Sequence, residues 1–317
     1  CVKKAINRNA IYCLDNDDKS VYSHYLFNEN IRVIPILNDE RKVVSIAYFG
    51  EIDFKISKRS LSYEDNEIYL IAEIGVNHNG DYKEALKLID YIAESGFDAV
   101  KMQFRSWITY SCADSFDDLD LSTEYIISEI NRTNITYEEE ELIVNFIKKK
   151  GLDFIGTPFD NEALNRLLMY EPDAIKIASC DLTNILLIKE CAKHNLPLIL
   201  STGMSSETEL INVNNWLNNK NVNKCFLHCN STYPTPIEDN NLNYINRMKL
   251  ITESIIGYSS HNGDPIIPIA AAALGAKMGD PNREVVAIRT PEARSYLVTI
   301  HFYNARKFPA PLTHATV

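Results

Sequence analysis

The sequence predicts an α/β fold, a (β/α)8 TIM barrel, and three observations favour it. Seven short apolar runs follow one another between residues 69 and 260, spaced mostly about 22–30 residues apart, as successive βα units are. The runs are apolar throughout instead of alternating with polar residues, which is typical of parallel strands buried on both faces. No GxGxxG motif follows the first run, which weakens the case for an open dinucleotide-binding sheet. The predicted strands are YLIAEIG, AVKMQF, DFIGTPF, AIKIAS, LPLILSTG, KCFLHC and SIIGYSS.

Helix signals separate these runs, so we expect a helix after each strand. Two residue pairs match the capping box and two glycines stand where the residue after a helix belongs: Asp81 with Glu84, Thr136 with Glu139, Gly96 and Gly151.

Three regions separate on pattern: residues 1–52, 53–277 and 278–317. The first region carries a helix-like run, SVYSHYLFNEN, and then two β-rich runs joined by a polar turn at 38–41. This order resembles the closing half of a CBS module, a family whose paired copies commonly sense adenine nucleotides. A small α+β appendage without a ligand is the alternative.

The last region, 278–317, must supply the eighth strand of a complete barrel. EVVAI at 284–288 or YLVTIHF at 296–302 are the candidates, although no amphipathic helix follows either of them.

Composition narrows the function classes. With 317 residues, 45% hydrophobic and 24% charged, the chain is expected to be globular and to hold a sizeable core. A net charge of −11 argues against nucleic acid as partner. No apolar run is long enough for a membrane span and the first residues lack a signal-peptide core, so we expect a cytoplasmic protein without membrane contact. The seven cysteines lack paired CxxC spacing, which indicates reduced thiols, and a start at Cys1 suggests a fragment.

Candidate site residues lie at the carboxyl ends of the predicted strands, where barrel enzymes carry their chemistry. Lys101 and Lys176 occupy matching places in AVK and AIK, inside apolar strands where an unpaired ammonium is costly to bury. Each lysine therefore needs an anion, either a ligand or a structural Glu or Asp of a neighbouring strand. Glu73 is the polar residue of the first strand, and hydroxyls lie at the ends of later strands: Thr157, Ser179, Ser201, Ser231 and Ser259. Two positive charges among several neutral donors suit a phosphate or a phosphorylated carboxylate.

Two histidines add further possibilities. His261, just past the last predicted strand, could bind a divalent metal, shuttle a proton or simply bond within its loop. His228 could equally be a satisfied core residue, and its C-x-x-H spacing from Cys225 is a weak zinc signal.

Seven motifs, in order and spacing, resemble the sialic acid synthase family of nonulosonate synthases: AEIGVNHNGD, VKMQF, GTPF, IKIASCDLTN, STGM, STYPTP and IIGYSSHNGD. The resemblance spans 53–277 and includes FKISKRSLSYEDNEIYL, which is similar to the hairpin that plugs the bottom of that family's barrel. It implies condensation of phosphoenolpyruvate with an N-acetylmannosamine-type sugar aldehyde, release of phosphate, and a homodimer.

The resemblance also implies roles for individual residues. Lys101, Lys176, Ser179, Ser201, Ser231 and Ser259 would hold phosphoenolpyruvate, with support from Thr157, and Glu73, Gln103, Asp181 and Tyr233 would face the sugar. His261 would be one ligand of a divalent ion, Mn²⁺ or Mg²⁺, that polarises the aldehyde oxygen.

Four departures from the family pattern matter. Asp181 stands where N-acetylneuraminate-forming members carry Glu, which suggests another sugar, such as the legionaminate precursor. The motif that supplies a second metal-binding His is missing after GAK, and His301 is the nearest substitute. The antifreeze-like C-terminal domain is absent, and the CBS-like segment is an addition.

Two other functions stay open. A related synthase could make a 3-deoxy-ulosonate from an aldose phosphate, although the motifs contain no Arg-rich phosphate pocket. The chain could also be a catalytically defective, nucleotide-sensing protein that uses the barrel as a scaffold.

Overall fold

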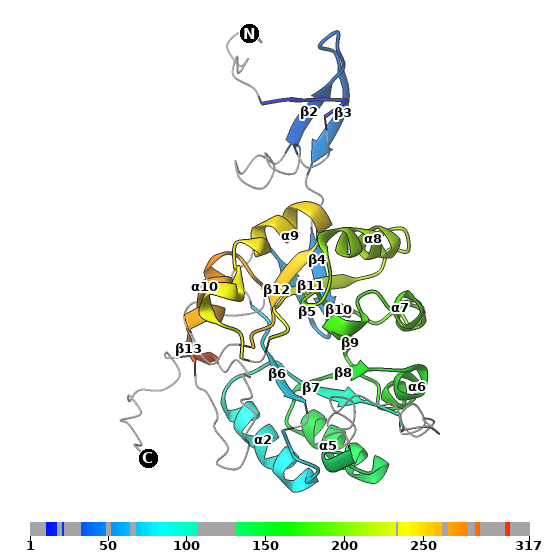
Figure 1. Cartoon of the computed structure of the whole chain (residues 1–317), viewed down its shortest axis with the longest axis vertical. Helices are drawn as coiled ribbons and strands as arrows, with labels where there is room; N and C mark the ends of the chain where they lie inside the picture. The colour runs from blue at the N-terminus through cyan, green and yellow to red at the C-terminus, as the bar shows by residue number, and fades with distance from the viewer. Residues whose placement is uncertain are drawn as a thin grey trace, which may run out of the picture.

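The computed structural model describes residues 11–17, 21, 33–48, 52–63, 68–75, 77–106, 131–232, 234–261, 266–277, 283–285 and 302–304. Its main feature is a curled parallel sheet of seven strands, a half-barrel, in the order β12-β11-β10-β9-β8-β7-β6 (Figure 1). All neighbouring pairs are parallel, and all seven predicted strands are confirmed. The strands are β6(Ile71–Gly75), β7(Ala99–Phe104), β8(Asp153–Pro158), β9(Ala174–Ile177), β10(Leu198–Ser201), β11(Lys224–His228) and β12(Ile255–Tyr258).

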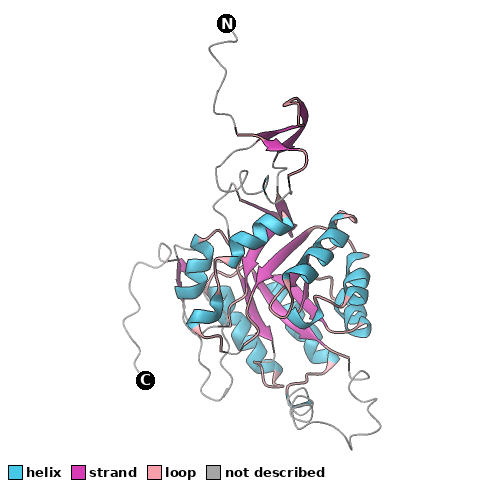
Figure 2. Ribbon diagram, turned by 45° about the horizontal axis from the view of Figure 1, so that its top comes forward, coloured by secondary structure: helices cyan, strands magenta, loops and turns pink. Residues whose placement is uncertain are grey.

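Helices cover the outer face of this sheet (Figures 1 and 2). A large apolar cluster fills the layer between helices and strands, including Leu88, Ile89 and Ile92 from the helix at 82–94 and Val100 and Phe104 from β7. The described helices are α2(Tyr82–Glu94), α5(Tyr137–Lys149), α6(Asn161–Met169), α7(Ile185–Ala192), α8(Glu207–Asn218), α9(Tyr244–Thr252) and α10(Ile266–Ala273), with short 3₁₀ turns η3(Ser179–Asp181) and η4(Ile237–Asn240).

Most of the predicted helix signals are confirmed. Thr136 and Glu139 form a full capping box at α5, and Gly96 and Gly151 adopt φ of +78° and +74° directly after α2 and α5. The box predicted at Asp81 is wrong in its second half. Asp81 caps α2 by accepting from the Lys83 N–H. The backbone N–H of Asp81 donates to the His78 carbonyl, so it is not available to the Glu84 side chain, which would accept it in a capping box.

A hairpin of β4(Asp53–Ile56) and β5(Arg59–Ser62) closes the amino end of the half-barrel, as predicted. Phe54, Ile56 and Leu61, each at most 1% exposed, pack against apolar side chains that point inward from the sheet strands. The Tyr63 hydroxyl, just past the hairpin, donates to the Ser254 carbonyl and accepts from the Ile256 N–H, both at 2.9 Å. Within the described residues the inner floor of the sheet is therefore filled at its amino end, which leaves the carboxyl end for a ligand.

The expected eighth barrel strand is not found among the described residues. β13(Arg283–Val285) and β14(Phe302–Asn304) overlap the two candidates, but they pair with each other in an antiparallel ladder and not with β12 or β6. Lys277 marks where an eighth strand would start, because its N–H donates to Ile256 of β12 at 2.8 Å and its carbonyl accepts from Tyr69, next to β6, at 3.1 Å. The sequence then runs into Gly279 and Pro281, residue types that weaken a strand.

An N-terminal sheet contains β1(Cys13–Leu14), β2(Val33–Leu37) and β3(Val43–Tyr48). β2 and β3 form the predicted hairpin around the turn at 38–41, where Arg41 adopts φ of +59°. β1 adds a parallel strand that the sequence did not predict. The helix expected at 20–30 lies outside the described residues except for position 21, and the CBS-like interpretation stays a prediction. None of the described helices combines the length and apolar character needed to cross a membrane.

Candidate active site

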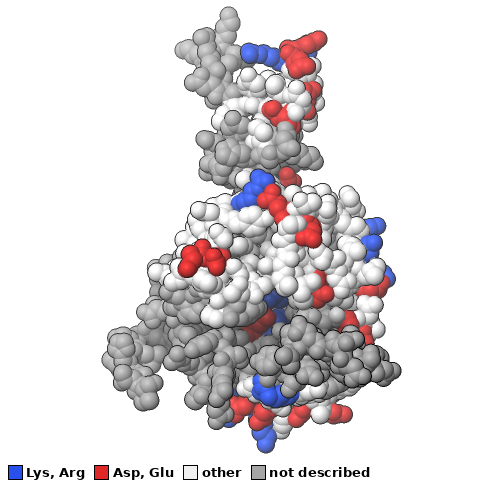
Figure 3. Space-filling view, in the orientation of Figure 1, with Lys and Arg blue, Asp and Glu red and all other residues white. Residues whose placement is uncertain are grey.

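The inner face of the half-barrel changes from apolar to polar along each strand. Side chains two residues apart share one face of a strand, so the inner positions can be followed in pairs. Toward the amino end these positions hold apolar residues of the inner core, and two positions later they hold the predicted polar residues: Ala99 then Lys101, Ile155 then Thr157, Ala174 then Lys176, and Ile199 then Ser201. The strand period therefore brings the polar side chains to one layer at the carboxyl end, where Figure 3 shows acidic and basic atoms side by side in a hollow.

The centre of this layer is an ion-paired triad of Glu73, Lys101 and Lys176. Glu73 Oε1 contacts Lys101 Nζ, and Glu73 Oε2 lies 2.6 Å from Lys176 Nζ. The lysines are 1% and 7% exposed, whereas the Glu73 side chain keeps 34% of its area exposed. The carboxylate therefore lies at the surface of the hollow, above two buried ammonium groups. The structural ion pair considered from the sequence is formed, and both lysines share it.

The charges in this triad alter one another's protonation. Burial alone would raise the pKa of Glu73, but the two ammonium groups outweigh it and hold that pKa well below its usual range. Burial lowers the pKa of Lys101 to about 8, although Glu73 opposes the shift. One carboxylate facing two cations leaves the cluster with net positive charge at neutral pH, which suits an anionic ligand.

Two buried hydroxyls beside the triad lack partners. Thr157 and Ser201 are 1% and 3% exposed, and neither Oγ atom has a hydrogen-bond partner within the described chain. Buried hydroxyls are normally satisfied, so an unpaired one is expected to face a bound ligand or water. Both were predicted from the sequence as phosphoenolpyruvate-binding residues.

Ser179 and Ser231 come together around Gly203, which follows β10. Ser179 Oγ accepts from the Gly203 N–H at 3.2 Å, and a Cβ at Gly203 would lie 2.6 Å from Ser231 Oγ. Only glycine fits there. Cys229, which is 5% exposed, lies 3.2 Å from Ser179 Oγ and was missed from the sequence because it reads as a core thiol. Ser259 is partly buried at the end of β12, where its N–H donates to the His228 carbonyl.

Gln103 and Asp181, predicted to face the sugar, lie at the same end of the sheet, and Tyr233 lies outside the described residues. Gln103 is opposite Thr157 in the β7–β8 ladder, and its Oε1 accepts from Arg105 at 3.1 Å. Asp181 in η3 accepts from Asn184 Nδ2 at 3.0 Å. Sequence reasoning missed Arg105, because an arginine just after a strand reads as an ordinary loop residue.

His261 lies close enough to the triad to feel its charge. Its Nδ1 contacts the Asn230 carbonyl, and burial, reinforced by Lys176, lowers the pKa of its imidazole. In the part of the chain that the structure describes, no three His, Cys, Asp or Glu side chains group to hold a metal ion. His301 lies outside the described residues, and a divalent ion with His261 as one ligand stays a prediction.

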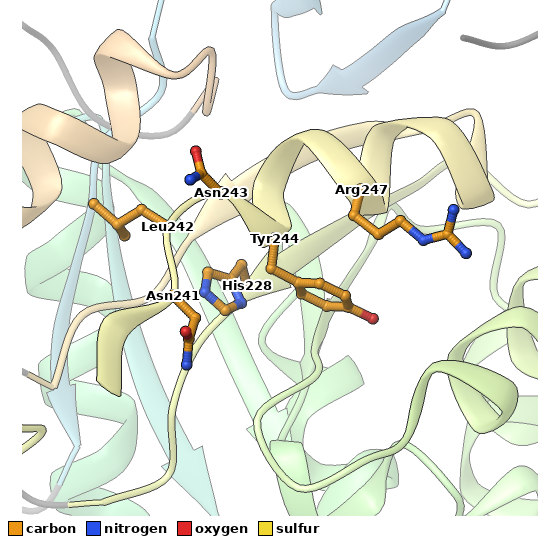
Figure 4. Close-up of a pocket in the computed structure, with 6 residues that line it drawn as sticks. All are labelled: His228, Asn241, Leu242, Asn243, Tyr244 and Arg247. Atoms are coloured by element: carbon orange, nitrogen blue, oxygen red, sulfur yellow. The ribbon is translucent and has the colours of Figure 1, made fainter. Parts of the chain in front are cut away.

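His228 is a satisfied core residue, one of the two interpretations given above. Its Nε2 lies 2.8 Å from the Asn240 carbonyl, and its ring packs against Tyr244 and Tyr258. It lines an open pocket of about 590 Å³ beside α9, where the Arg247 guanidinium extends away from the imidazole (Figure 4) and pairs with Glu207 at 2.7 Å. The imidazole and the guanidinium thus both have partners within the protein.

Comparison with known proteins shows the family of this chain. The NeuB family model matches residues 88–279. An N,N'-diacetyllegionaminic acid synthase of Campylobacter jejuni is 35% identical over 65% of this chain and 64% of its own length. A pseudaminic acid synthase of the same organism is 32% identical over 68% of this chain and 64% of its own. The chain thus spans less than two thirds of the length of these curated relatives.

A solved structure supports the same assignment. The N-acetylneuraminic acid synthetase of Leptospira borgpetersenii, crystallised with citrate, is 31% identical with a TM-score of 0.63, covering 72% of this chain and 76% of that one. The family model alone covers more than half of the sequence. The chain belongs to the NeuB family, among whose members are these sialic, legionaminic and pseudaminic acid synthases.

Proposed function

We propose that this chain carries the active site of a nonulosonate synthase, which condenses phosphoenolpyruvate with an N-acetylmannosamine-type sugar aldehyde and releases phosphate. The observation that carries the proposal is the convergence of Lys101 and Lys176 on one carboxylate, beside the unpartnered hydroxyls of Thr157 and Ser201. Two buried cations with neutral donors around them match a small ligand that bears both a phosphate and a carboxylate.

Phosphoenolpyruvate would bind over the two lysines and take over part of the role that Glu73 has in the free protein. The hydroxyls of Thr157 and Ser201 would donate to its oxygens, and Ser179, Ser231 and Ser259 would complete the pocket at the ends of β9, β11 and β12. The developing negative charge on phosphate and carboxylate would then lie next to fixed ammonium groups in a site with little water.

The sugar would lie on the side of Gln103, Asp181 and Tyr233, next to Glu73. Asp181 is shorter than the glutamate of N-acetylneuraminate-forming members, which leaves room for a larger sugar substituent. A 2,4-diacetamido-6-deoxy sugar, the legionaminate precursor, is therefore the substrate that we propose first. The similarity to a legionaminic acid synthase supports this choice.

The reaction forms one carbon–carbon bond and breaks one C–O bond. The enol carbon of phosphoenolpyruvate attacks the aldehyde carbon, and the aldehyde oxygen becomes an alkoxide that takes up a proton. Water adds to the oxocarbenium carbon left behind, and the adduct collapses to a ketone as inorganic phosphate leaves. Lys101 and Lys176 hold the phosphate and carboxylate through these steps.

A divalent ion with His261 as one ligand stays a prediction, and no step is assigned to it. The homodimer and the division at 1–52, 53–277 and 278–317 are likewise proposals.

Phosphate release tests the proposal. The chain is incubated with phosphoenolpyruvate and Mn²⁺, and with N-acetylmannosamine, its 2,4-diacetamido-6-deoxy analogue or an aldose phosphate. We expect sugar-dependent release with one of the N-acetylated sugars and its loss in Lys101→Ala. Release with the aldose phosphate alone would favour the 3-deoxy-ulosonate synthase. Adenine nucleotide binding by a folded chain that releases no phosphate would favour the nucleotide-sensing alternative.

A further inference from the structure

Three strand ends meet around the Ser179 hydroxyl. Ser179 opens η3 just after β9, Gly203 follows β10, and Cys229 follows β11. The Thr202 N–H still belongs to the sheet, because it donates to the Leu227 carbonyl of β11 at 3.1 Å. The next N–H, that of Gly203, donates instead to Ser179 Oγ at 3.2 Å. The backbone of β10 therefore fixes the position of this hydroxyl.

The Cys229 thiol reaches the same hydroxyl from β11, one strand beyond β10. Its Sγ lies 3.2 Å from Ser179 Oγ, and the residue is 5% exposed. The approach is possible because no side chain stands between them on β10. A Cβ built on Gly203 would lie 2.8 Å from Cys229 Sγ, closer than such atoms come in proteins. The missing side chain of Gly203 thus lets a thiol that follows β11 contact a hydroxyl that follows β9.

These contacts determine which group the Ser179 hydrogen can serve. A hydroxyl has one hydrogen to donate and two lone pairs that accept, whereas a thiol is a weak donor and a weak acceptor. The Gly203 N–H occupies one lone pair of Ser179 Oγ. When the Cys229 S–H occupies the other, the Ser179 O–H is available to a third group. When the Ser179 O–H donates to the sulfur instead, it has no hydrogen for a ligand.

A bound anion would select the first arrangement. Ser201, two residues before Gly203, is 3% exposed and its Oγ has no partner within the described chain, which independently indicates a ligand at this part of the layer. An anionic oxygen is a stronger acceptor than a thiol sulfur, so it attracts the Ser179 hydrogen and leaves the S–H to donate to Ser179 Oγ. Thiol, hydroxyl and anion then form a chain of hydrogen bonds whose members polarise one another.

We propose that Cys229 is a positioning residue whose S–H donates to Ser179 Oγ and so directs the Ser179 hydrogen to an oxygen of phosphoenolpyruvate. Cys229 acts through Ser179 and does not touch the ligand itself. The proposal rests on the proposed function and adds to it a residue outside the set that the family resemblance implies.

The affinity for phosphoenolpyruvate tests this role in the full chain. Calorimetric titration without sugar gives the Kd and requires no turnover. Cys229→Ala should raise the Kd about three- to fivefold, the order expected for one weak hydrogen bond. Cys229→Ser places another donor at the same position and should restore most of the affinity. The effect of Cys229→Ala should disappear in a Ser179→Ala background, because the thiol then has no hydroxyl to orient.

Infrared spectroscopy adds a readout that a merely structural role would not move. The S–H stretching band that Cys229→Ser removes belongs to this thiol. In the wild-type chain it should shift to lower wavenumber when phosphoenolpyruvate binds, because the S–H becomes a donor in a stronger hydrogen bond. In Ser179→Ala the band should not shift.

Cys225→Ala is the matched control, because Cys225 is a fully buried thiol of β11 among the apolar side chains of the inner core. It should lower the free energy of unfolding in urea without changing the Kd of phosphoenolpyruvate. An unchanged Kd in Cys229→Ala, or an equal rise in the Ser179→Ala background, would overturn this inference alone. If Cys229→Ala does not fold, a wild-type S–H band that stays in place on binding overturns it equally. Failure of the wild-type chain to bind phosphoenolpyruvate would overturn the proposed function as well.

Discussion

Glu73→Gln should destabilise the protein and at the same time strengthen anion binding. The amide keeps the shape of the carboxylate but leaves Lys101 and Lys176 without their shared counter-ion. Removing one partner from a buried ion pair costs about 3–5 kcal/mol. Because the Glu73 side chain is 34% exposed, water would compensate for part of this loss, and we expect the free energy of unfolding to fall by about 2 kcal/mol at pH 7. Because no carboxylate competes for the two lysines, phosphoenolpyruvate should bind roughly tenfold more tightly, which corresponds to about 1.4 kcal/mol.

Urea unfolding followed by circular dichroism measures the first effect, and calorimetric titration with phosphoenolpyruvate measures the second. Glu140→Gln is the matched control, because Glu140 is 5% exposed and pairs with Arg166 away from the hollow. It should lower stability without changing the Kd. A Glu73→Gln protein that is as stable as the wild type and binds phosphoenolpyruvate no more tightly would refute the idea that Glu73 occupies the anion site.

Four further predictions follow from the same geometry. Burial lowers the pKa of Lys101 from 10.5 to about 8, so keeping the buried ammonium charged costs the folded state roughly 3 kcal/mol below about pH 8. This cost disappears as the pH rises toward 10.5 and the lysine becomes neutral in the folded protein. The stability of Lys101→Met relative to the wild type, measured by urea unfolding, should therefore fall between about pH 8 and 10.5, and a constant difference would contradict the prediction. Thr157→Val and Ser201→Ala remove unpartnered hydroxyls, so each should change stability by less than about 1 kcal/mol while raising the Kd of phosphoenolpyruvate about five- to tenfold; a large loss of stability with an unchanged Kd would show that these hydroxyls are structural. If a divalent ion is required, a chelator should abolish phosphate release and His261→Ala should weaken Mn²⁺ binding in calorimetry, whereas equal Mn²⁺ affinity in both proteins would exclude His261 as a ligand. Phe54→Ala in the fully buried hairpin plug should cost about 3–5 kcal/mol in urea unfolding, and a cost below about 1 kcal/mol would show that the plug does not support the sheet.

Much of the sheet and part of the site could be predicted because each depends on local pattern. Continuous apolar runs identified all seven parallel strands, and a lysine inside such a run stands out because it needs a buried anion. Lys101 and Lys176 are therefore identifiable from the sequence alone. Their shared partner, Glu73, was identified as a site residue, but its position between them depends on strand register and on the curl of the sheet.

Other features depend on contacts between distant segments and leave no local pattern. Arg105 contacts Phe159 and Arg166, which lie more than fifty residues further along the chain. Cys229 reads as a core thiol until Ser179 is placed beside it. The eighth strand was expected because a barrel needs to close, but the apolar runs after Lys277 form an antiparallel pair within the described residues. The eighth strand, expected from the family pattern, was therefore not found among the described residues, whereas the two lysines expected from their apolar strands are buried at the site.

The formation of the carbon–carbon bond is the most direct test of the proposed function. Phosphoenolpyruvate labelled with ¹³C at its methylene carbon is incubated with the chain, Mn²⁺ and the 2,4-diacetamido-6-deoxy sugar or N-acetylmannosamine, and the ¹³C NMR spectrum is followed over time. We predict that the vinylic methylene signal is replaced by that of a saturated methylene bonded to the sugar carbon, only when both substrates are present and not with Lys101→Ala. A label that stays in phosphoenolpyruvate, or that passes to pyruvate regardless of sugar, would contradict the account.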